Sequence, residues 1–155
     1  MFKLSRRDLV VASIAIALTF FATALSQSKL PTMKSSVFDW NKIAMEKTEK
    51  GGLRKFFDTR TETLDQLEVH VTTLNPGVTS HVPHQHPNEE MIIVKEGVVE
   101  ELVSGEFKKV GAGSIIFQAP NQLHTIRNAG DTPATYFAIK WVSPGMVEKK
   151  TTAEE

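Results

Sequence analysis

The chain has 155 residues, of which 41% are hydrophobic and 23% are charged, and its formal net charge is zero. These values are ordinary for one soluble globular domain. A balanced charge argues against a general binder of nucleic acids or membrane surfaces, because both kinds of protein usually carry a basic excess. The sequence contains no cysteine, which excludes disulfide bonds, thiolate metal sites and cysteine nucleophiles.

Residues 1–26 have the pattern of an export signal. The basic start MFKLSRRDLV leads into an apolar run from Leu9 to Leu25, and ATA at 22–24 supplies the small residues of a cleavage site. We therefore expect an N-terminal signal helix that is removed, and a periplasmic or otherwise exported protein with no stable membrane insertion after cleavage. If cleavage fails, the run is long enough to remain as a membrane anchor.

The stretch SRRDLVV within this segment resembles the twin-arginine export motif through Arg6 and Arg7. It departs from that motif at Val10 and Val11, where a lysine is usual. Proteins of this export class cross the membrane already folded. The resemblance therefore implies that a metal would be acquired in the cytoplasm.

Residues 27–66 are expected to form a linker and an N-terminal strand segment. In this region VFDWNKI (37–43) is the candidate edge strand, and EKTEKGG (46–52) has the composition of a charged loop. Beyond it, short alternating segments are separated by turn residues. The predicted strands cover residues 67–74, 91–97, 98–103, 106–110, 114–118, 123–128 and 134–142.

Short strands with frequent turns predict an all-β sandwich or barrel over residues 67–142. The sequence shows no internal repeat, so we expect a single barrel. The charged tail, residues 143–155, is expected to be disordered.

Three histidines and two adjacent glutamates crowd into the stretch HVPHQHPNEEM, residues 81–91. Residues two apart on a strand point to the same face. His84 and His86 are therefore expected to point together, and Glu90 joins them if the strand resumes in phase after the short loop. Glu89 would then point outward.

His81 has the opposite parity to His84 and is the weakest ligand candidate of the three histidines in this stretch. If His81 lies at the mouth of a pocket, it would transfer protons or contact the substrate. A fourth ligand has to come from another segment, and His124 is the candidate. Imidazole and carboxylate ligands together suit iron, manganese, nickel, copper or zinc. Three apolar residues share parity with the ligands and would wall the cavity: Ile92, Val94 and Ile126.

The stretch GVTSHVPHQHPNEEMIIVKEG resembles the first sequence motif of the cupin superfamily. His84, His86, Glu90 and Gly97 stand at the positions of that motif. Gly77 lies one residue further from the first histidine than is commonest.

The stretch GSIIFQAPNQLHTIRN resembles the second cupin motif. Gly113, His124 and Asn128 match in register. Pro120 falls one place late, and Asn121 replaces the usual turn glycine, a position where asparagine tolerates the left-handed conformation.

The resemblance covers roughly residues 67–142 and implies a single cupin-type jelly-roll barrel. It also implies one divalent transition metal held by His84, His86, Glu90 and His124, with manganese or iron expected first and nickel, copper or zinc as alternatives. Glu90 and His81 are the expected catalytic residues. Proteins of this kind are commonly dimers, so we expect a homodimer that acts on a small-molecule substrate and binds no nucleic acid.

Four protein ligands leave two positions of a six-coordinate ion for substrate, or for substrate and dioxygen. Dioxygenase chemistry and Lewis-acid isomerisation or hydrolysis share this ligand set, and the sequence does not separate them. The alternative is a non-catalytic periplasmic cupin that binds or stores a metal or small ligand. A metal-free cupin of the sugar-nucleotide epimerase kind would leave the four-residue set unexplained.

Overall fold

The computed structural model describes residues 32–144. The signal peptide expected over residues 1–26 and most of the tail expected over residues 143–155 lie outside these residues. Within the described range, none of the helical structure has the length and apolar character that a bilayer span requires.

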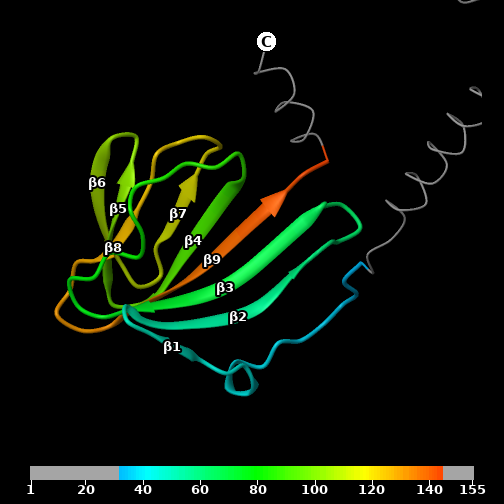
Figure 1. Cartoon of the computed structure of the whole chain (residues 1–155), viewed down its shortest axis with the longest axis horizontal. Coiled ribbons are helices and arrows are strands. Elements are labelled where there is room, and N and C mark those ends of the chain that lie inside the picture. The colour runs from blue at the N-terminus through cyan, green and yellow to red at the C-terminus, as the bar shows by residue number, and fades with distance from the viewer. Residues whose placement is uncertain (1–31, 145–155) are drawn as a thin grey trace, which may run out of the picture. The chain divides into compact units, whose positions relative to one another are not determined.

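Nine strands and one short 3-10 helix make up the described part of the chain (Figure 1). The helix, η1, covers Trp40–Lys42 and precedes all of the strands. The strands are β1 Glu46–Thr48, β2 Gly51–Thr59, β3 Gln66–Leu74, β4 Glu89–Glu96, β5 Val98–Val103, β6 Glu106–Gly111, β7 Ile115–Gln118, β8 Ile126–Asn128 and β9 Ala134–Val142.

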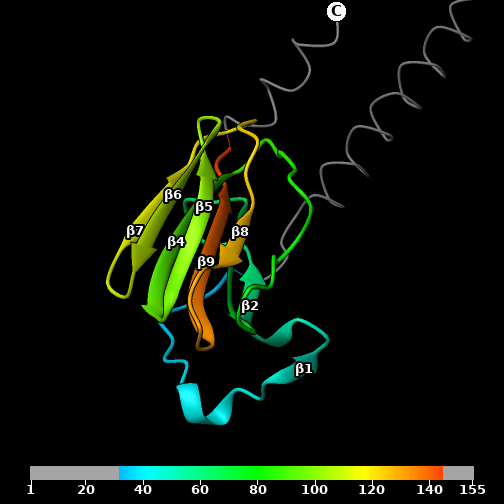
Figure 2. The same ribbon diagram turned by 90° about the vertical axis from the view of Figure 1, so that its left-hand side faces the viewer.

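The strands form two antiparallel sheets. The larger sheet has the order β1-β2-β3-β9-β4-β7, and the smaller has the order β6-β5-β8. Neighbours in the larger sheet include strands that are far apart in the sequence, such as β3 with β9 and β4 with β9. Figures 1 and 2 show the smaller sheet beside the β4 and β7 part of the larger one. This is the all-β jelly-roll architecture that the sequence predicted.

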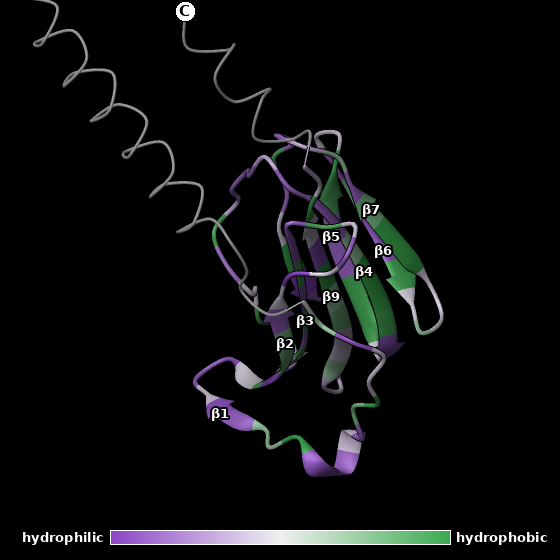
Figure 3. Cartoon of the chain, turned by 90° about the vertical axis from the view of Figure 1, so that its right-hand side faces the viewer, coloured by the Kyte–Doolittle hydropathy of each residue, from purple (hydrophilic) through white to green (hydrophobic). Residues whose placement is uncertain are grey.

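The hydrophobic core draws on strands of both sheets. Ile92 and Val94 of β4 and Val99 of β5 are almost fully buried, and Tyr136 and Ala138 of β9 belong to the same cluster. Burying each large aliphatic side chain contributes about 1.5–3 kcal/mol. Figure 3 shows the result in hydropathy, with green stretches along β4 and a purple, hydrophilic β1 outside the core.

The seven strands predicted from residue 67 onward are confirmed as β3 to β9, and β5 and β9 have the predicted bounds. β8 begins later than predicted. Its expected first part contains His124, which pairs with His84 as an isolated bridge. His124 therefore lies outside the regular strand pairing, just before β8 begins.

The edge strand predicted over residues 37–43 is wrong, because this segment contains the helix η1. Asp39 caps the helix by accepting a hydrogen bond from the Asn41 N–H through its side chain. The ring of Trp40 then packs near those of Phe56 and Phe137, with centroids 6.2 and 6.0 Å away. Polar capping and aromatic packing thus decide the local structure in place of strand alternation.

The charged loop predicted over residues 46–52 is also wrong, because it forms β1 and the start of β2. The two strands make a tight hairpin in which Thr48 pairs with Gly51. Gly51 has φ +142°, and a Cβ there would lie 2.2 Å from the carbonyl oxygen of Thr73. Only glycine allows β2 to approach β3 this closely.

Candidate metal centre

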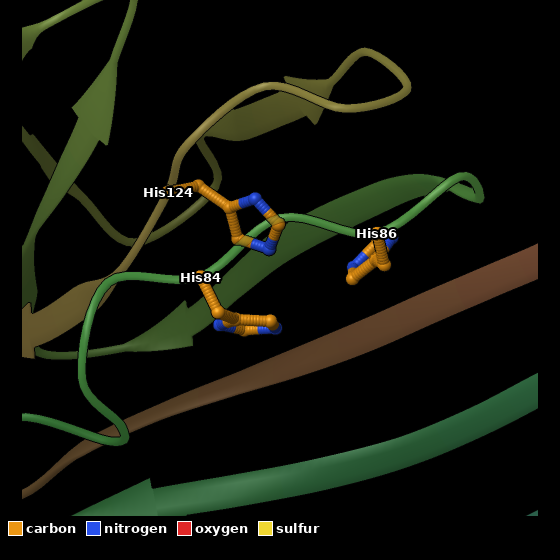
Figure 4. A group of neighbouring side chains, drawn as sticks. All are labelled: His84, His86 and His124. Atoms are coloured by element: carbon orange, nitrogen blue, oxygen red, sulfur yellow. The ribbon is translucent and has the colours of Figure 1, made fainter. Parts of the chain in front are cut away.

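Two segments outside the regular strands bring three histidines together (Figure 4). His84 and His86 belong to the connection between β3 and β4, and His124 belongs to the connection between β7 and β8. One ring nitrogen from each histidine lies within 4.8 Å of one from each of the others. The ring centroids are 4.6 to 5.5 Å apart. These three histidines could hold a metal ion.

Main-chain hydrogen bonds fix the two segments against each other. The His84 N–H donates to the His124 carbonyl at 3.1 Å, and the His124 N–H donates to the His84 carbonyl at 2.9 Å. The Asn121 N–H donates to the His86 carbonyl at 2.8 Å. Asn121 has φ 58°, which confirms the left-handed conformation expected for the residue that replaces the turn glycine. The positions of the ligand candidates are therefore set by the backbone.

The rings of His86 and His124 are oriented by neighbouring carbonyl groups. Nδ1 of His86 lies 3.0 Å from the Asn88 carbonyl oxygen, and Nδ1 of His124 lies 2.8 Å from that of Gln122. A carbonyl can only accept, so both Nδ1 atoms carry the proton and donate it. Nε2 of each neutral ring is then left as a lone-pair donor for a metal.

Glu90 contacts one histidine of the group. Its Oε2 lies 3.1 Å from Nε2 of His86, but its carboxylate is not part of the group that lies within 4.8 Å. With Nδ1 of His86 protonated, this contact brings a lone pair and a carboxylate oxygen face to face. A cation or an additional proton has to lie between them to make the contact favourable. The donor set therefore fits a metal ion, and Glu90 as its fourth ligand is a prediction that this geometry leaves open.

Glu89, the second glutamate of the stretch, lies elsewhere. Its Oε2 accepts a hydrogen bond from Nε1 of Trp141 at 2.8 Å. It is not among the described residues that line the cavity of the histidines. The neighbouring glutamates thus point in different directions, as alternation along β4 requires.

His81 touches the histidine group although its parity made it the weakest ligand candidate. Its Nδ1 lies 2.9 Å from Nδ1 of His84 and 3.0 Å from the Val82 carbonyl oxygen. Burial lowers the pKa of His81, and the neighbouring His84 and His124 lower it further. Because the Val82 carbonyl can only accept, Nδ1 of a neutral His81 carries the proton and can share it with Nδ1 of His84. His81 is placed to orient a ligand.

The histidines open into a cavity of about 340 Å³. Ile92 and Ile126 line it as the sequence predicted, but Val94, which belongs to the same buried cluster, does not. Part of the lining is polar. It includes His70 of β3 and Lys140 of β9, both of which contact the carboxylate of Glu68.

Glu101 lines the same cavity, and sequence reasoning missed it. The side chain is fully buried, and its Oε1 accepts a hydrogen bond from Nε2 of Gln118 at 2.7 Å. Burial raises the pKa of Glu101 to about 8, against the hydrogen bond from Gln118, and the charge of Glu90 adds to the rise. Alternation along the strand could have predicted its burial, because Glu101 lies two residues after the buried Val99 and points to the same face.

Two sheets around one core define a small jelly-roll barrel, and the histidines that line its cavity could hold a metal. Residues 70–140 match the family model described as the cupin domain. The chain therefore contains a cupin domain, as its two motifs predicted.

Solved structures of similar fold include several enzymes. The polyketide cyclase RemF from Streptomyces resistomycificus is 21% identical, with a TM-score of 0.55, and the match covers 73% of this chain and 82% of that one. KdgF from Halomonas is 15% identical, with a TM-score of 0.56 and coverages of 73% and 99%. A predicted oxalate decarboxylase from Thermotoga maritima is 18% identical, with a TM-score of 0.55 and coverages of 69% and 99%. No curated protein matches the chain. At these identities the likeness shows the fold alone.

Proposed function

We propose that this protein is an exported metal-dependent enzyme that acts on a small molecule in the cavity beside its histidines. His84, His86 and His124 would hold one divalent metal, with Glu90 as the fourth ligand. The observation that carries this proposal is the 3.1 Å contact between Nε2 of His86 and Oε2 of Glu90. Two acceptors at this distance need a cation or an additional proton between them, and the two further histidines beside them favour a metal ion.

The metal, with manganese or iron as the first choices, would supply either a redox centre for dioxygen or a Lewis acid for a carbonyl group. The chain's own residues do the remaining work. The carbonyl groups of Asn88 and Gln122 keep the rings of His86 and His124 in one tautomer. Such outer contacts orient ligands and raise their basicity.

The size of the cavity supports an enzyme over a metal store. About 340 Å³ is far more than the roughly 30 Å³ that one water molecule occupies, and it lies in the range of small-molecule sites. Ile92 and Ile126 give the cavity apolar surface beside the histidines. A store for a single ion has no use for this additional room.

Glu90 and His81 are the proposed proton-transfer groups. Glu90 lines the cavity and contacts one histidine of the group, so its carboxylate could leave the metal and accept a proton from a substrate bound beside it. His81 also lines the cavity, and its lowered pKa keeps the ring neutral and able to accept a proton.

Oxygen uptake and anaerobic turnover together test this proposal. The mature protein is loaded with manganese or iron and mixed with a panel of enols, thiols and catechols. Oxygen consumption with one of them indicates a dioxygenase, and substrate loss without oxygen indicates Lewis-acid isomerisation or hydrolysis. Neither reaction, combined with slow exchange of the bound metal, would contradict an enzyme and favour a store.

We further propose that residues 1–26 direct export and that the mature protein is a homodimer. The basic start and apolar run support export. Fractionation of cells that produce the full chain tests the location, and light scattering of the mature protein tests the dimer. A cytoplasmic, monomeric product would contradict both.

A further inference from the structure

We infer that Glu101 is a substrate-contacting residue, which donates a hydrogen bond from a neutral carboxylic acid to a small anion held in the histidine-lined cavity. The inference rests on the proposed function for the nature of the site. It adds the class of ligand, a small molecule with an anionic oxygen, and a residue that recognises it.

The fold aims Glu101 inward from the smaller sheet. Residues of β5 alternate between faces, and Glu101 follows Val99 on the buried face. Its side chain has no exposed surface, yet it lines the cavity together with the histidines and Glu90. A buried carboxyl group in such a place needs partners for both oxygens.

Only one of the two oxygens has a partner. Oε1 accepts from Gln118, whereas Oε2 is buried without a hydrogen-bond partner among the described residues. No lysine, arginine or histidine of residues 32–144 forms an ion pair with Glu101. A buried carboxylate with one neutral donor is strongly unfavourable. A neutral acid instead carries an O–H group that seeks an acceptor.

The groups that face Glu101 favour the same neutral state. Gln118 of β7 donates to it, and Glu90 of β4 places a negative charge near it. Tyr136 of β9 is a buried phenol, and burial raises its pKa so that it stays neutral. None of these three groups is a cation, which agrees with the raised pKa of about 8 for Glu101 in the metal-free protein.

Charge in the rest of the cavity selects an anion as the acceptor. Lys50 lines the cavity, donates to the Ser80 carbonyl and forms no ion pair with a carboxylate within residues 32–144. Lys140 also lines it and is paired with Glu68. A divalent metal on the histidines would exceed the single charge of Glu90. With that metal bound, the cavity would be positive around a neutral donor, which suits a carboxylate or an enolate.

Malonate, a small dicarboxylate, is the probe for this inference. Its dissociation constant is measured by calorimetry near pH 7 on the metal-loaded mature protein and on two variants. Glu101→Gln keeps a donor of similar shape. The double variant Glu101→Leu with Gln118→Leu removes the donor and its partner together, so that neither is left unpaired.

We expect wild type and Glu101→Gln to bind malonate alike and the double variant to bind it about 10-fold or more weakly, the effect of losing a hydrogen bond to a charged group. Equal binding by the double variant, with its metal content retained, would overturn the inference. So would the absence of malonate binding by the wild type at millimolar concentration.

The pH dependence separates substrate contact from a structural role. In the metal-free proteins the wild-type acid becomes a carboxylate above about pH 8, so malonate binding should weaken between about pH 7 and about pH 9. Glu101→Gln should lack this loss, and an identical pH profile in both proteins would overturn the inference. If all three proteins fail to bind metal, the proposed metal site falls, and the same pH comparison on the metal-free proteins still decides the role of Glu101.

Discussion

His84 and His124 hold each other by two main-chain hydrogen bonds, although four strands of the sequence lie between them. The bridge joins the connection before β4 to the connection before β8. Because these bonds use backbone groups, they do not depend on the imidazole rings. The rings can therefore be removed one at a time without separating the two segments, and this allows clean tests of the site.

His124→Ala should abolish stoichiometric metal binding. The ring is almost fully buried and offers Nε2 to the site, and its removal leaves two histidines in the group. Elemental analysis of protein purified after metal loading measures the effect. His70→Ala is the matched control, because His70 lines the same cavity and is not in the histidine group. Full metal content in His124→Ala would remove His124 from the ligand set.

His81→Ala should weaken metal binding without abolishing it. His81 contacts Nδ1 of His84, and the loss of such an outer partner typically lowers metal affinity about 10- to 100-fold. Competition against a chelator of known affinity measures the change. The stoichiometry at saturating metal should stay as in the wild type. An unchanged affinity would show that His81 does not orient His84.

Glu101→Gln should stabilise the metal-free protein at alkaline pH. The pKa of about 8 in the folded protein lies above the ordinary value of 4.5, so the folded protein keeps a proton that the unfolded chain releases. The wild-type free energy of unfolding is thus undiminished below about pH 4.5 and falls as the pH rises towards 8. Glutamine has no proton to lose and keeps the contact with Gln118.

Urea unfolding of both proteins measures this difference. We expect near-equal free energies of unfolding at about pH 4.5 and an advantage of roughly 2–4 kcal/mol for Glu101→Gln at about pH 8. Glu96→Gln, at the exposed end of β4, is the control and should show no such trend. A constant difference across this pH range would mean that Glu101 is ionised in the folded protein.

Asn128→Ala should destabilise the fold and leave the metal content unchanged. Nδ2 of the buried Asn128 donates to the carbonyls of Leu74 and Thr132, and its Oδ1 accepts from the Gly130 N–H. Three backbone groups lose their partner in the variant, so we expect a loss of about 2–4 kcal/mol in the free energy of unfolding. Chemical denaturation measures it, with the exposed Asn41→Ala as control. Loss of metal from folded Asn128→Ala would give this residue a second role.

The sequence predicted β3 to β9 well because each carries alternating residues or lies between clear turns. It missed β2 for a physical reason. The pairing of β2 with β3 shifts register between Lys55 and Phe57, which marks a β-bulge. A bulge inserts a residue and breaks the period of two on which strand prediction depends. Phe56 and Phe57 therefore stand side by side in the sequence and join different aromatic contacts.

Three of the four ligand candidates could be found from spacing and motif, since His84, His86 and His124 meet in the structure. The contact of His81 with His84 could not be found, because parity applies to regular strands and this segment lies outside one. Glu101 was missed because a second glutamate precedes it and a charged pair usually indicates a solvated face. Its partner Gln118 comes from another sheet, and only the tertiary fold reveals that contact.

Different segments of the chain contribute the histidines of the cavity and its other polar lining residues. The histidines belong to the connections before β4 and β8, whereas Lys50, His70 and Lys140 belong to the hairpin at β2 and to strands β3 and β9. We expect substitutions on these strands to alter which molecule fits the cavity and to leave the three histidines in place. If the proposed function is correct, the choice of substrate and the binding of the metal could therefore change independently of each other.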